Sequence, residues 1–196
     1  MQHQQRLLEL FKRCKLVGKL GLPMGRRERL VASSAIPAGL CGCASQPPDS
    51  DTLEAARRHV HFALHRGSRF CQLPLFFAVG VDTWRADPGA VWVWKAVEVA
   101  RLLGNNLGRA AFAATLGART DGPIAGAKAT LAWAGLELRD WVLWSLNDER
   151  GICVLGSTKH RLRGFVLEAV RARDLSRASR RSEQQGLSQG ADVDEC

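Results

Sequence analysis

The expected fold class follows from the N-terminal stretch Leu7-Leu-Glu-Leu-Phe-Lys-Arg-Cys-Lys-Leu-Val-Gly-Lys-Leu-Gly-Leu-Pro23. Its apolar residues recur at the spacing of one helical face: Leu7, Leu10, Phe11, Cys14 and Val17. Three lysines, Lys12, Lys15 and Lys19, form a stripe roughly 130° round the helix from that face. Pro23 ends the helix, because proline disfavours the α conformation in the residue before it. The stretch therefore predicts an amphipathic helix with a basic side.

Similar patterns outward from this stretch predict further helices. They are expected over residues 24–34, 49–66, 87–103, 107–118 and 124–134, and from Thr158 onward. We expect Ile36-Pro37 to bend or stop the second helix, and Gly104-Asn105-Asn106 to break the helix that begins at Asp87-Pro88. The Asp49–Asp51 segment supplies N-cap residues for the third helix.

Two segments stay open, and the C-terminal end is expected to lack regular structure. Residues 73–81 fit a short strand or a buried helix, and residues 135–156 fit a hairpin or loops. The Gln/Ser/Gly-rich end from about Ser182 is typical of disorder. The predicted class is mainly α: an irregular helical bundle with a basic N-terminal helical hairpin and a long basic C-terminal helix. We divide it into segments 1–66, 67–181 and an acidic tail, 182–196.

Composition excludes several classes of protein. The 196 residues are 46% hydrophobic and 24% charged, which is ordinary for a globular chain and excludes collagen-like or wholesale disordered classes. No apolar run reaches about 18 residues and no apolar segment follows the polar start, so we expect neither a transmembrane helix nor a secretory signal. The six cysteines have irregular spacing. We expect reduced thiols in an intracellular protein, nuclear or cytoplasmic.

The net charge of +9 is concentrated near the two ends of the chain. Residues 1–30 and 157–181 carry +6 each, whereas residues 182–196 carry −4. Two basic ends around a neutral middle favour a polyanionic partner, most commonly nucleic acid, although basic surface helices also occur in proteins without one. The candidate phosphate contacts are Lys12, Arg13, Lys15, Lys19, Arg26, Arg27 and Arg29, with a second patch of Arg173, Arg177, Arg180 and Arg181.

A zinc site is a weaker alternative. Cys41 and Cys43 precede His61 and His65, which lie at i and i+4 of a predicted helix. Zinc takes four convergent Cys and His ligands, but the gaps here differ from those of zinc fingers. The histidines also share their predicted face with charged residues, so a solvated face is the preferred interpretation.

No catalytic constellation emerges from the sequence. The segment 122–130 departs from the nucleotide-binding pattern G-x-x-x-x-G-K-[ST], and Asp87 is interpreted as a helix cap rather than a metal ligand. The six tryptophans are interpreted mainly as core residues. We therefore expect no enzymatic activity and no cofactor.

Two adjacent segments carry a family resemblance. Residues 11–23 and 26–42 resemble the region just after the catalytic palm in LINE-type (non-LTR) retrotransposon reverse transcriptases. Ala35-Ile-Pro-Ala-Gly-Leu-Cys-Gly42 is similar to a block of that family, with Cys41 where the family usually has tyrosine. The resemblance covers residues 6–66; looser similarity continues through 122–136 and the last helix.

The resemblance implies a thumb-like segment over residues 1–66 and a post-thumb region over 67–181, with the basic helix facing a primer–template backbone. It also implies that the palm, with its metal-binding aspartates, lies upstream of Met1, so that this chain does not polymerise alone. The expected function is sequence-independent binding of an RNA or RNA–DNA hybrid backbone, with neither a membrane nor a small-molecule substrate as partner.

Three alternatives remain open. The basic helices could dock an acidic protein in a helical interaction module with no nucleic-acid role. The module could instead be stabilised by zinc. The chain could also be a remnant of a decayed element without a selected activity.

Overall fold

Helices dominate the computed structural model, which describes residues 2–43, 49–65, 72–81, 84–108, 111, 114 and 122–190. The helices are α1 (Gln2–Lys19), α2 (Met24–Leu30), α3 (Ile36–Leu40), α4 (Ser50–His65), α5 (Leu73–Val79), α6 (Pro88–Leu107), α8 (Gly122–Trp133) and α9 (Lys159–Gly190), with a π-helical turn η1 (Val31–Ala35) and a 3-10 turn η2 (Trp84–Ala86). The strands are β1 (Leu136–Arg139), β2 (Val142–Ser145) and β3 (Gly151–Cys153). The predicted mainly α class is confirmed.

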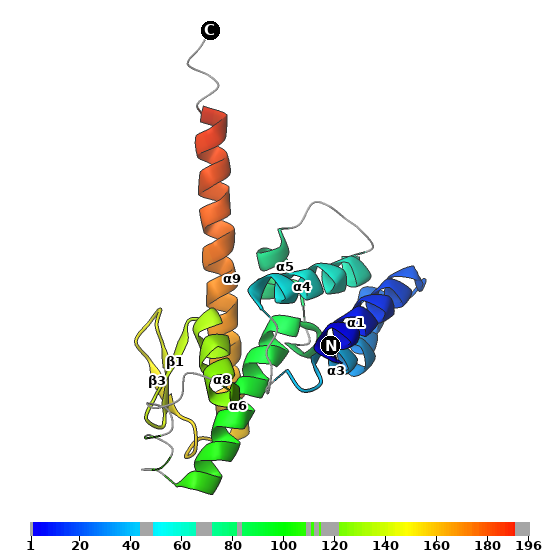
Figure 1. Cartoon of the computed structure of the whole chain (residues 1–196). Coiled ribbons are helices and arrows are strands. Elements are labelled where there is room, and N and C mark those ends of the chain that lie inside the picture. The colour runs from blue at the N-terminus through cyan, green and yellow to red at the C-terminus, as the bar shows by residue number, and fades with distance from the viewer. Residues whose placement is uncertain are drawn as a thin grey trace.

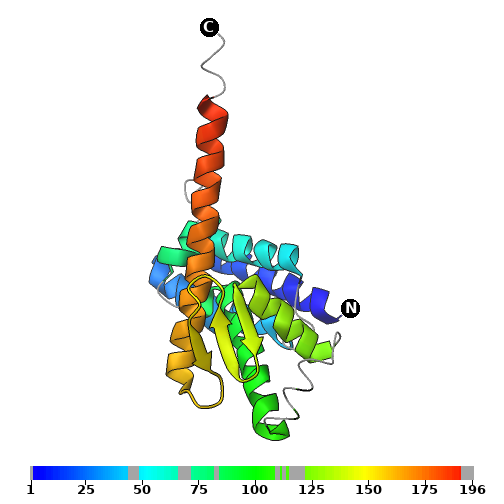
Figure 2. The same ribbon diagram turned by 90° about the vertical axis from the view of Figure 1, so that its left-hand side faces the viewer.

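Helix α6 lies at the centre of the molecule (Figure 1). It contacts α8 and α9 on one side, and α3 and α4 on the other, where α1 packs farther out. Figure 2 shows the sheet in front of α9, with α1 and α4 behind. Two hydrophobic cores meet at α6, because Trp92 belongs to the N-terminal core and Val93 to the C-terminal one. The first half of α9 is packed, whereas its second half projects beyond the other helices (Figure 1).

The N-terminal core forms between α1, α3 and α4. The predicted apolar face of α1 is buried there, with Leu10 packed among residues such as Leu53 of α4. Helix α4 begins where the sequence predicts, because Asp49 Oδ1 accepts a hydrogen bond from the backbone N–H of Thr52 at 2.8 Å.

The second predicted helix does not stop at Ile36-Pro37, so the stop that we expected as one of two alternatives, a bend being the other, is wrong. Helix α2, turn η1 and helix α3 follow one another without a gap. In a regular α-helix, Pro37 would lack the donor for one hydrogen bond and its ring would press on the carbonyl four residues earlier. The wider π turn just before it accommodates both effects. Within that turn Ser34 Oγ donates to the Leu30 carbonyl at 2.6 Å.

Gly104 does not break α6 either, contrary to our expectation. The helix runs to Leu107 and ends before Gly108, whose φ of 71° suits a helix C-terminus. A methyl group on Gly104 would overlap the ring of Trp141, which lies in the turn between β1 and β2. Gly104 therefore allows close packing of helix against sheet, and the helix end is placed one turn later.

Residues 135–156 resolve into an antiparallel sheet in the order β1-β2-β3. A two-residue turn joins β1 to β2, and its Asp140 has a φ of 52°. On one side of the sheet Leu143 packs into the C-terminal core. Trp144 lies opposite Gly151 in the β2–β3 pair and packs over it. The sheet thus closes the C-terminal core.

Residues 73–81, for which a strand and a helix were both open, form helix α5, which packs on α9. Helix α9 begins after Thr158, as predicted, and Thr158 Oγ1 accepts from the backbone N–H of Arg161 at 3.3 Å. These two contacts anchor the packed half of α9.

The expected loss of regular structure from about Ser182 is wrong for residues 182–190, which continue α9 to Gly190. Glutamate and glutamine, which are good helix formers, follow Ser182, and Ser179 Oγ bonds Glu183 across one turn at 3.4 Å. Residues 191–196 lie outside the described residues, as does most of the helix predicted over 107–118.

Candidate functional site

The structure divides the cations of residues 1–30 into two groups. Three arginines donate to main-chain carbonyls: Arg6 Nη1 to Cys41 at 2.5 Å, Arg13 Nη1 to Ser34 at 3.1 Å, and Arg27 Nη1 to Ala63 at 2.8 Å. Arg27 is 6% exposed. Arg13 and Arg27, both predicted as phosphate contacts, therefore join α1 and α2 to their neighbours.

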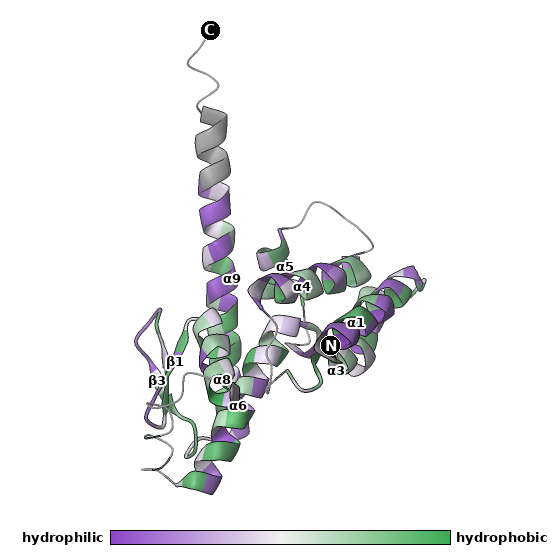
Figure 3. Ribbon diagram, viewed as in Figure 1, coloured by the Kyte–Doolittle hydropathy of each residue, from purple (hydrophilic) through white to green (hydrophobic). Residues whose placement is uncertain are grey.

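The other five cations, which we name the N-terminal basic surface, are Lys12, Lys15, Lys19, Arg26 and Arg29. All five are exposed, and none of their side chains has a hydrogen bond or ion pair within the part of the chain that the structure describes. The turn at 20–23 brings the end of α1 next to the start of α2. Figure 3 shows hydrophilic residues along α1. With no acidic partner, these charges attract an external polyanion.

Aromatic rings on α4 border this surface. Phe62 is 52% exposed and lies beside Gly18 in the lysine-bearing part of α1, where a Cβ would be 3.7 Å from a ring carbon of Phe62. One turn earlier, His59 stacks on Phe11 with ring centroids 4.1 Å apart. Burial and the neighbouring Arg58 lower the pKa of His59, so its ring is neutral at pH 7. The sequence analysis did not identify these rings as site residues.

The second predicted patch is not a free basic surface. Arg173 is half-buried, lies 3.6 Å from the centroid of the Trp133 ring, and pairs with Asp174 at 3.0 Å. Arg177 pairs with Glu54 of α4. Arg180 bonds Ser176 of its own helix, and Arg181 is exposed. Two of the four predicted contacts are thus part of a network that links α9 to the body of the protein.

That network centres on Arg57, whose side chain has no exposed surface. Arg57 binds Asp87 through Nε and Nη2 at 3.0 and 3.1 Å, and Asp174 through Nη1 at 2.9 Å and through Nη2. Its guanidinium lies 4.3 Å from the centroid of the Phe77 ring. We use the name Arg57 network for three cations and three carboxylates: Arg57, Arg173, Arg177, Glu54, Asp87 and Asp174. Its formal charges cancel, as buried charges require.

Burial acts on the pKa values of this network. It lowers the pKa of Arg57, but Asp87 and Asp174 outweigh it, so the net pKa of Arg57 is raised and the guanidinium stays charged. Burial raises the pKa of Asp87, and the attraction of Arg57 does not fully offset it. Asp87 also accepts from the backbone N–H of Gly89 at 2.9 Å, which confirms its predicted role as the cap of α6.

A sequence signal for this network existed. Arg57 falls among the apolar positions of its helix, and Asp174 follows Val166 and Val170 at a spacing of four residues. A charged residue on an apolar face predicts a buried ion pair, because burying it unpaired would cost several kcal/mol, on the order of 3–5. Asp87 carried no such signal, since capping alone explained it.

The four residues of the zinc alternative separate into pairs. His61 and His65 pack edge-on against Phe76, with ring centroids 4.6 and 5.0 Å from it. Cys41 and Cys43 follow α3 and line a different part of the molecule. Within the described residues, no group of three or more His, Cys, Asp or Glu side chains is placed to hold a metal ion. The four described cysteines are free thiols, as predicted for those positions: Cys14, Cys41, Cys43 and Cys153.

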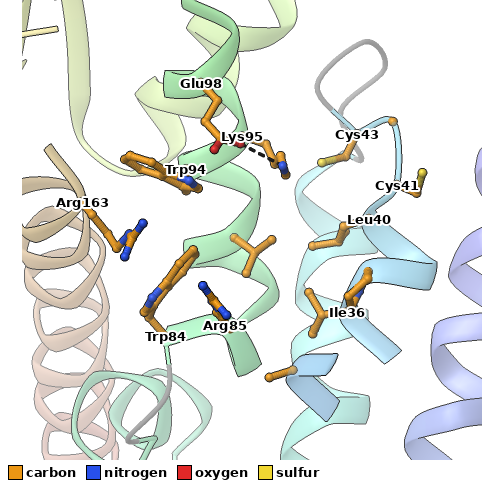
Figure 4. A pocket seen from close by; sticks show the side chains of 14 residues that line it. Ile36, Leu40, Cys41, Cys43, Trp84, Arg85, Trp94, Lys95, Glu98 and Arg163 are labelled. Atoms are coloured by element: carbon orange, nitrogen blue, oxygen red, sulfur yellow. Dashed lines mark hydrogen bonds and ion pairs between the residues drawn. The ribbon is translucent and has the colours of Figure 1, made fainter. Parts of the chain in front are cut away.

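The cysteine pair lies at one end of a groove of about 530 Å³ between α3 and α6. We name it the α3–α6 groove. Its apolar wall includes Ile36 and Leu40, which face Trp84 and Trp94 across the groove (Figure 4). The two indoles meet edge to face, with ring centroids 6.4 Å apart. Its volume and lining match those of small-molecule sites.

Three cations and one carboxylate line the groove. Lys95 pairs with Glu98 at 2.8 Å, as the dashed line in Figure 4 marks. Arg85 lies 5.8 Å from the Trp84 ring, and the guanidinium of Arg163 lies 5.2 Å from Trp84. Neither arginine pairs with a carboxylate in the part of the chain that the structure describes. The groove therefore carries two unbalanced positive charges.

The chain matches no protein-family model, no curated protein and no solved structure. Among the described helices, none combines the length and apolarity needed to cross a membrane. Function must therefore be argued from the N-terminal basic surface, the Arg57 network and the α3–α6 groove.

Proposed function

We propose that this chain binds nucleic acid through the phosphate backbone, without reading sequence, and that the N-terminal basic surface makes the contacts. Lysine and arginine side chains bind phosphates regardless of the bases. The resemblance of residues 6–66 to the thumb region of LINE-type reverse transcriptases supports the same proposal and points to an RNA–DNA hybrid as ligand.

One observation carries the proposal: the cations of α1 and α2 that the fold does not use are the exposed ones. Arg13 and Arg27 bind carbonyls, whereas Lys12, Lys15 and Lys19 project from one side of α1 with no acidic partner among the described residues. Such a concentration of unpaired positive charge attracts a polyanionic partner, which is what the proposal requires.

The test is fluorescence anisotropy of the whole chain with a labelled RNA–DNA hybrid, titrated at several salt concentrations. Five phosphate contacts predict a log–log salt slope of about −4. Changing Lys12, Lys15 and Lys19 to glutamate should weaken binding at least about a hundredfold at low salt and reduce the slope by about 3.

A matched control reverses three exposed cations of α9: Lys159, Arg161 and Arg171. This variant has the same net charge as the α1 variant, so it should bind nearly as tightly as the unchanged protein if the contact is local. An equal loss of affinity in both variants would mean that net charge, rather than a local contact, causes the binding. Unchanged binding by the α1 variant would refute the assignment.

Phe62 adds a distinction between ligands. An exposed ring beside lysines stacks unpaired bases, at about 1–3 kcal/mol per base, but has no access to bases inside a duplex. Phe62→Ser should therefore weaken the binding of single-stranded RNA at least fivefold and leave the binding of the hybrid nearly unchanged. Circular dichroism of the variant checks that α4 is intact.

A second candidate function has one observation in its favour. Leu8 and Leu16 are 56% and 63% exposed on the same side of α1 as the lysines. Leucines among lysines suit docking to an acidic amphipathic helix. Under this alternative, Leu8→Ser with Leu16→Ser would abolish partner capture, and capture would persist at high salt. Backbone binding of nucleic acid would be nearly insensitive to the two leucine changes.

A further inference from the structure

The α3–α6 groove goes beyond the proposed backbone contact and does not depend on it. The five residues of the N-terminal basic surface are absent from the lining of the groove. The groove's own chemistry comes from three elements that are distant in sequence: α3, the segment from η2 into α6, and the first turns of α9.

Its two arginines lie beside aromatic rings rather than carboxylates, whereas Lys95 pairs with Glu98. The guanidinium of Arg163 lies 5.2 and 5.3 Å from the ring centroids of Trp84 and Trp94, and that of Arg85 lies 5.8 Å from Trp84. A cation on an indole face is positioned without being neutralised. Both guanidinium groups therefore keep their attraction for an anion.

Arg163 also has a donor without an acceptor. Its Nε is buried and makes no hydrogen bond within the described residues. A buried donor without a partner costs about 1–3 kcal/mol. Because Nε itself has almost no exposed surface, an anion in the groove would approach the outer nitrogens of the Arg163 guanidinium instead.

The groove also favours a planar, partly apolar ligand. Ile36, Leu40 and Val91 form an apolar wall, and Trp84 and Trp94 supply aromatic surface. A volume of about 530 Å³ accommodates one ring system with a sugar-sized substituent, and is small for a folded domain. A doubly charged phosphate uses two guanidinium groups better than a singly charged carboxylate does.

We propose that the α3–α6 groove binds an aromatic phosphate of nucleotide size, with the phosphate attracted by Arg85 and Arg163, which flank Trp84, and the ring against the apolar wall and the indoles. The ligand could be a free nucleotide or the 5′-terminal nucleotide of a strand, because both present a base and an accessible phosphate. The experiment below separates these two sources.

The test is isothermal titration calorimetry of the whole chain with adenosine 5′-monophosphate. One saturable site is expected, and adenosine without the phosphate should bind at least tenfold more weakly. Changing Arg85 and Arg163 to alanine should weaken the binding of the nucleotide at least tenfold. The matched control, Arg161→Ala with Arg171→Ala, removes two exposed α9 arginines outside the groove and should leave affinity unchanged.

Several results would overturn the proposal: no binding of the nucleotide at millimolar concentration by a folded chain, equal affinity for adenosine, or unchanged affinity in the double variant. If the double variant does not fold, Arg85→Ala alone provides the test, because Arg85 is exposed and a loss of at least threefold is expected. Slower alkylation of Cys41, which lines the groove, in the presence of the nucleotide gives an independent readout.

The source of the ligand follows from a second pair of titrations, with a short single-stranded RNA carrying either a 5′-phosphate or a 5′-hydroxyl. Tighter binding of the 5′-phosphorylated strand than of the 5′-hydroxyl strand, with the difference lost when Arg85 and Arg163 are changed to alanine, assigns the groove to a strand end. Equal binding of the two strands, with the free nucleotide still bound, assigns it to a free metabolite. The comparison stays separate from the backbone contact, because both strands present the same internal phosphates to the N-terminal basic surface.

Discussion

Among the arginines that lie against aromatic rings, Arg57 in the core differs from Arg163 in the α3–α6 groove. Arg57 lies 4.3 Å from the centroid of Phe77 and is bound by two carboxylates. Arg163 lies 5.2 Å from the centroid of Trp84 and pairs with no carboxylate among the described residues. An arginine beside an aromatic ring thus has a different role in each of the two regions. Where acidic partners converge, the charge holds helices together; where they do not, the charge stays available to a ligand.

The strongest test of this contrast is Arg57→Met. Asp87 would lose its counter-ion and Asp174 would keep only Arg173, and breaking such a buried pair costs about 3–5 kcal/mol. We expect that loss in the free energy of unfolding, measured by urea denaturation with circular dichroism. Arg58→Met, on the exposed side of the same helix, is the control and should change stability by less than about 0.5 kcal/mol.

A compensating change distinguishes lost charge balance from lost packing. Combining Arg57→Met with Asp174→Leu removes one of the two carboxylates that bind Arg57 and leaves Arg173 with Glu54, so it should recover about 1–2 kcal/mol. No recovery would mean that the shape of Arg57, rather than its charge, stabilises the contact between α4, α6 and α9.

Glu54 at the edge of the network gives a smaller effect with a defined pH dependence. Burial raises the pKa of Glu54, but the hydrogen bond from Arg177 and the nearby Arg57 outweigh it, so its net pKa lies below the ordinary value of 4.5. Its contribution to stability is therefore complete above pH 4.5 and is lost as the pH falls through the folded-state pKa. Glu54→Gln should cost about 1 kcal/mol at pH 7.

The measurement for Glu54 is the unfolding free energy at a series of pH values between 7 and 3. The difference between the unchanged protein and Glu54→Gln should shrink toward the acid end of the series. A difference that grows on acidification would contradict the sign of the pKa shift.

On the groove side, Arg163→Met should change the unfolding free energy by less than about 1 kcal/mol, because no carboxylate is left behind. Urea denaturation in parallel with Arg57→Met gives the comparison directly. A loss as large as that of Arg57→Met would remove the distinction between the two regions.

The smallest effect concerns the thiols at the end of the groove. Burial raises the pKa of the Cys43 thiol to about 11, whereas Cys41 is exposed. At pH 8 the thiolate fraction of Cys43 is therefore about a hundredfold below that of an ordinary cysteine. Mass spectrometry after brief iodoacetamide treatment should find Cys41 modified and Cys43 unmodified until the chain is unfolded. Stability should be the same in either state of Cys41.

Local patterns predicted the helices whose ends depend on local chemistry. Asp49, Asp87 and Thr158 act as caps within three residues of their own position, so their sequence context contains the whole interaction. The apolar face of α1 was equally visible, because its spacing repeats within one element.

Long-range packing explains the wrong predictions. Gly104 is needed for close contact with Trp141, which lies 37 positions later in the chain, and no local pattern reveals that contact. The π turn before Pro37 likewise relieves the clash between the proline ring and the preceding turn of helix, which the spacing of apolar residues does not reveal. For the candidate site, composition treated all basic residues alike, whereas the fold distinguishes Arg27, which binds a carbonyl, from Lys12, which binds nothing in the described structure.

The groove was not predicted at all, for the same reason. Its lining comes from residues 32–43, 84–98 and Arg163, which share no sequence motif and meet only in the folded chain. The tryptophans were interpreted mainly as core residues, which is confirmed for Trp94 at 5% exposed, whereas Trp84 is only partly buried. Only their joint placement next to two unpaired guanidinium groups gives the groove its chemistry.

The π turn η1 also sets an angular phase. Each residue advances an α-helix by about 100°, so deleting one residue from η1 would restore regular spacing and rotate α3 about its axis by roughly that angle. Leu40, now 4% exposed, would turn out of the N-terminal core, and the wall that Ile36 gives to the groove would face elsewhere. The single additional residue of this turn therefore sets the rotation of α3 about its axis. It leaves the length of the helix almost unchanged and determines which side of α3 packs against the rest of the molecule.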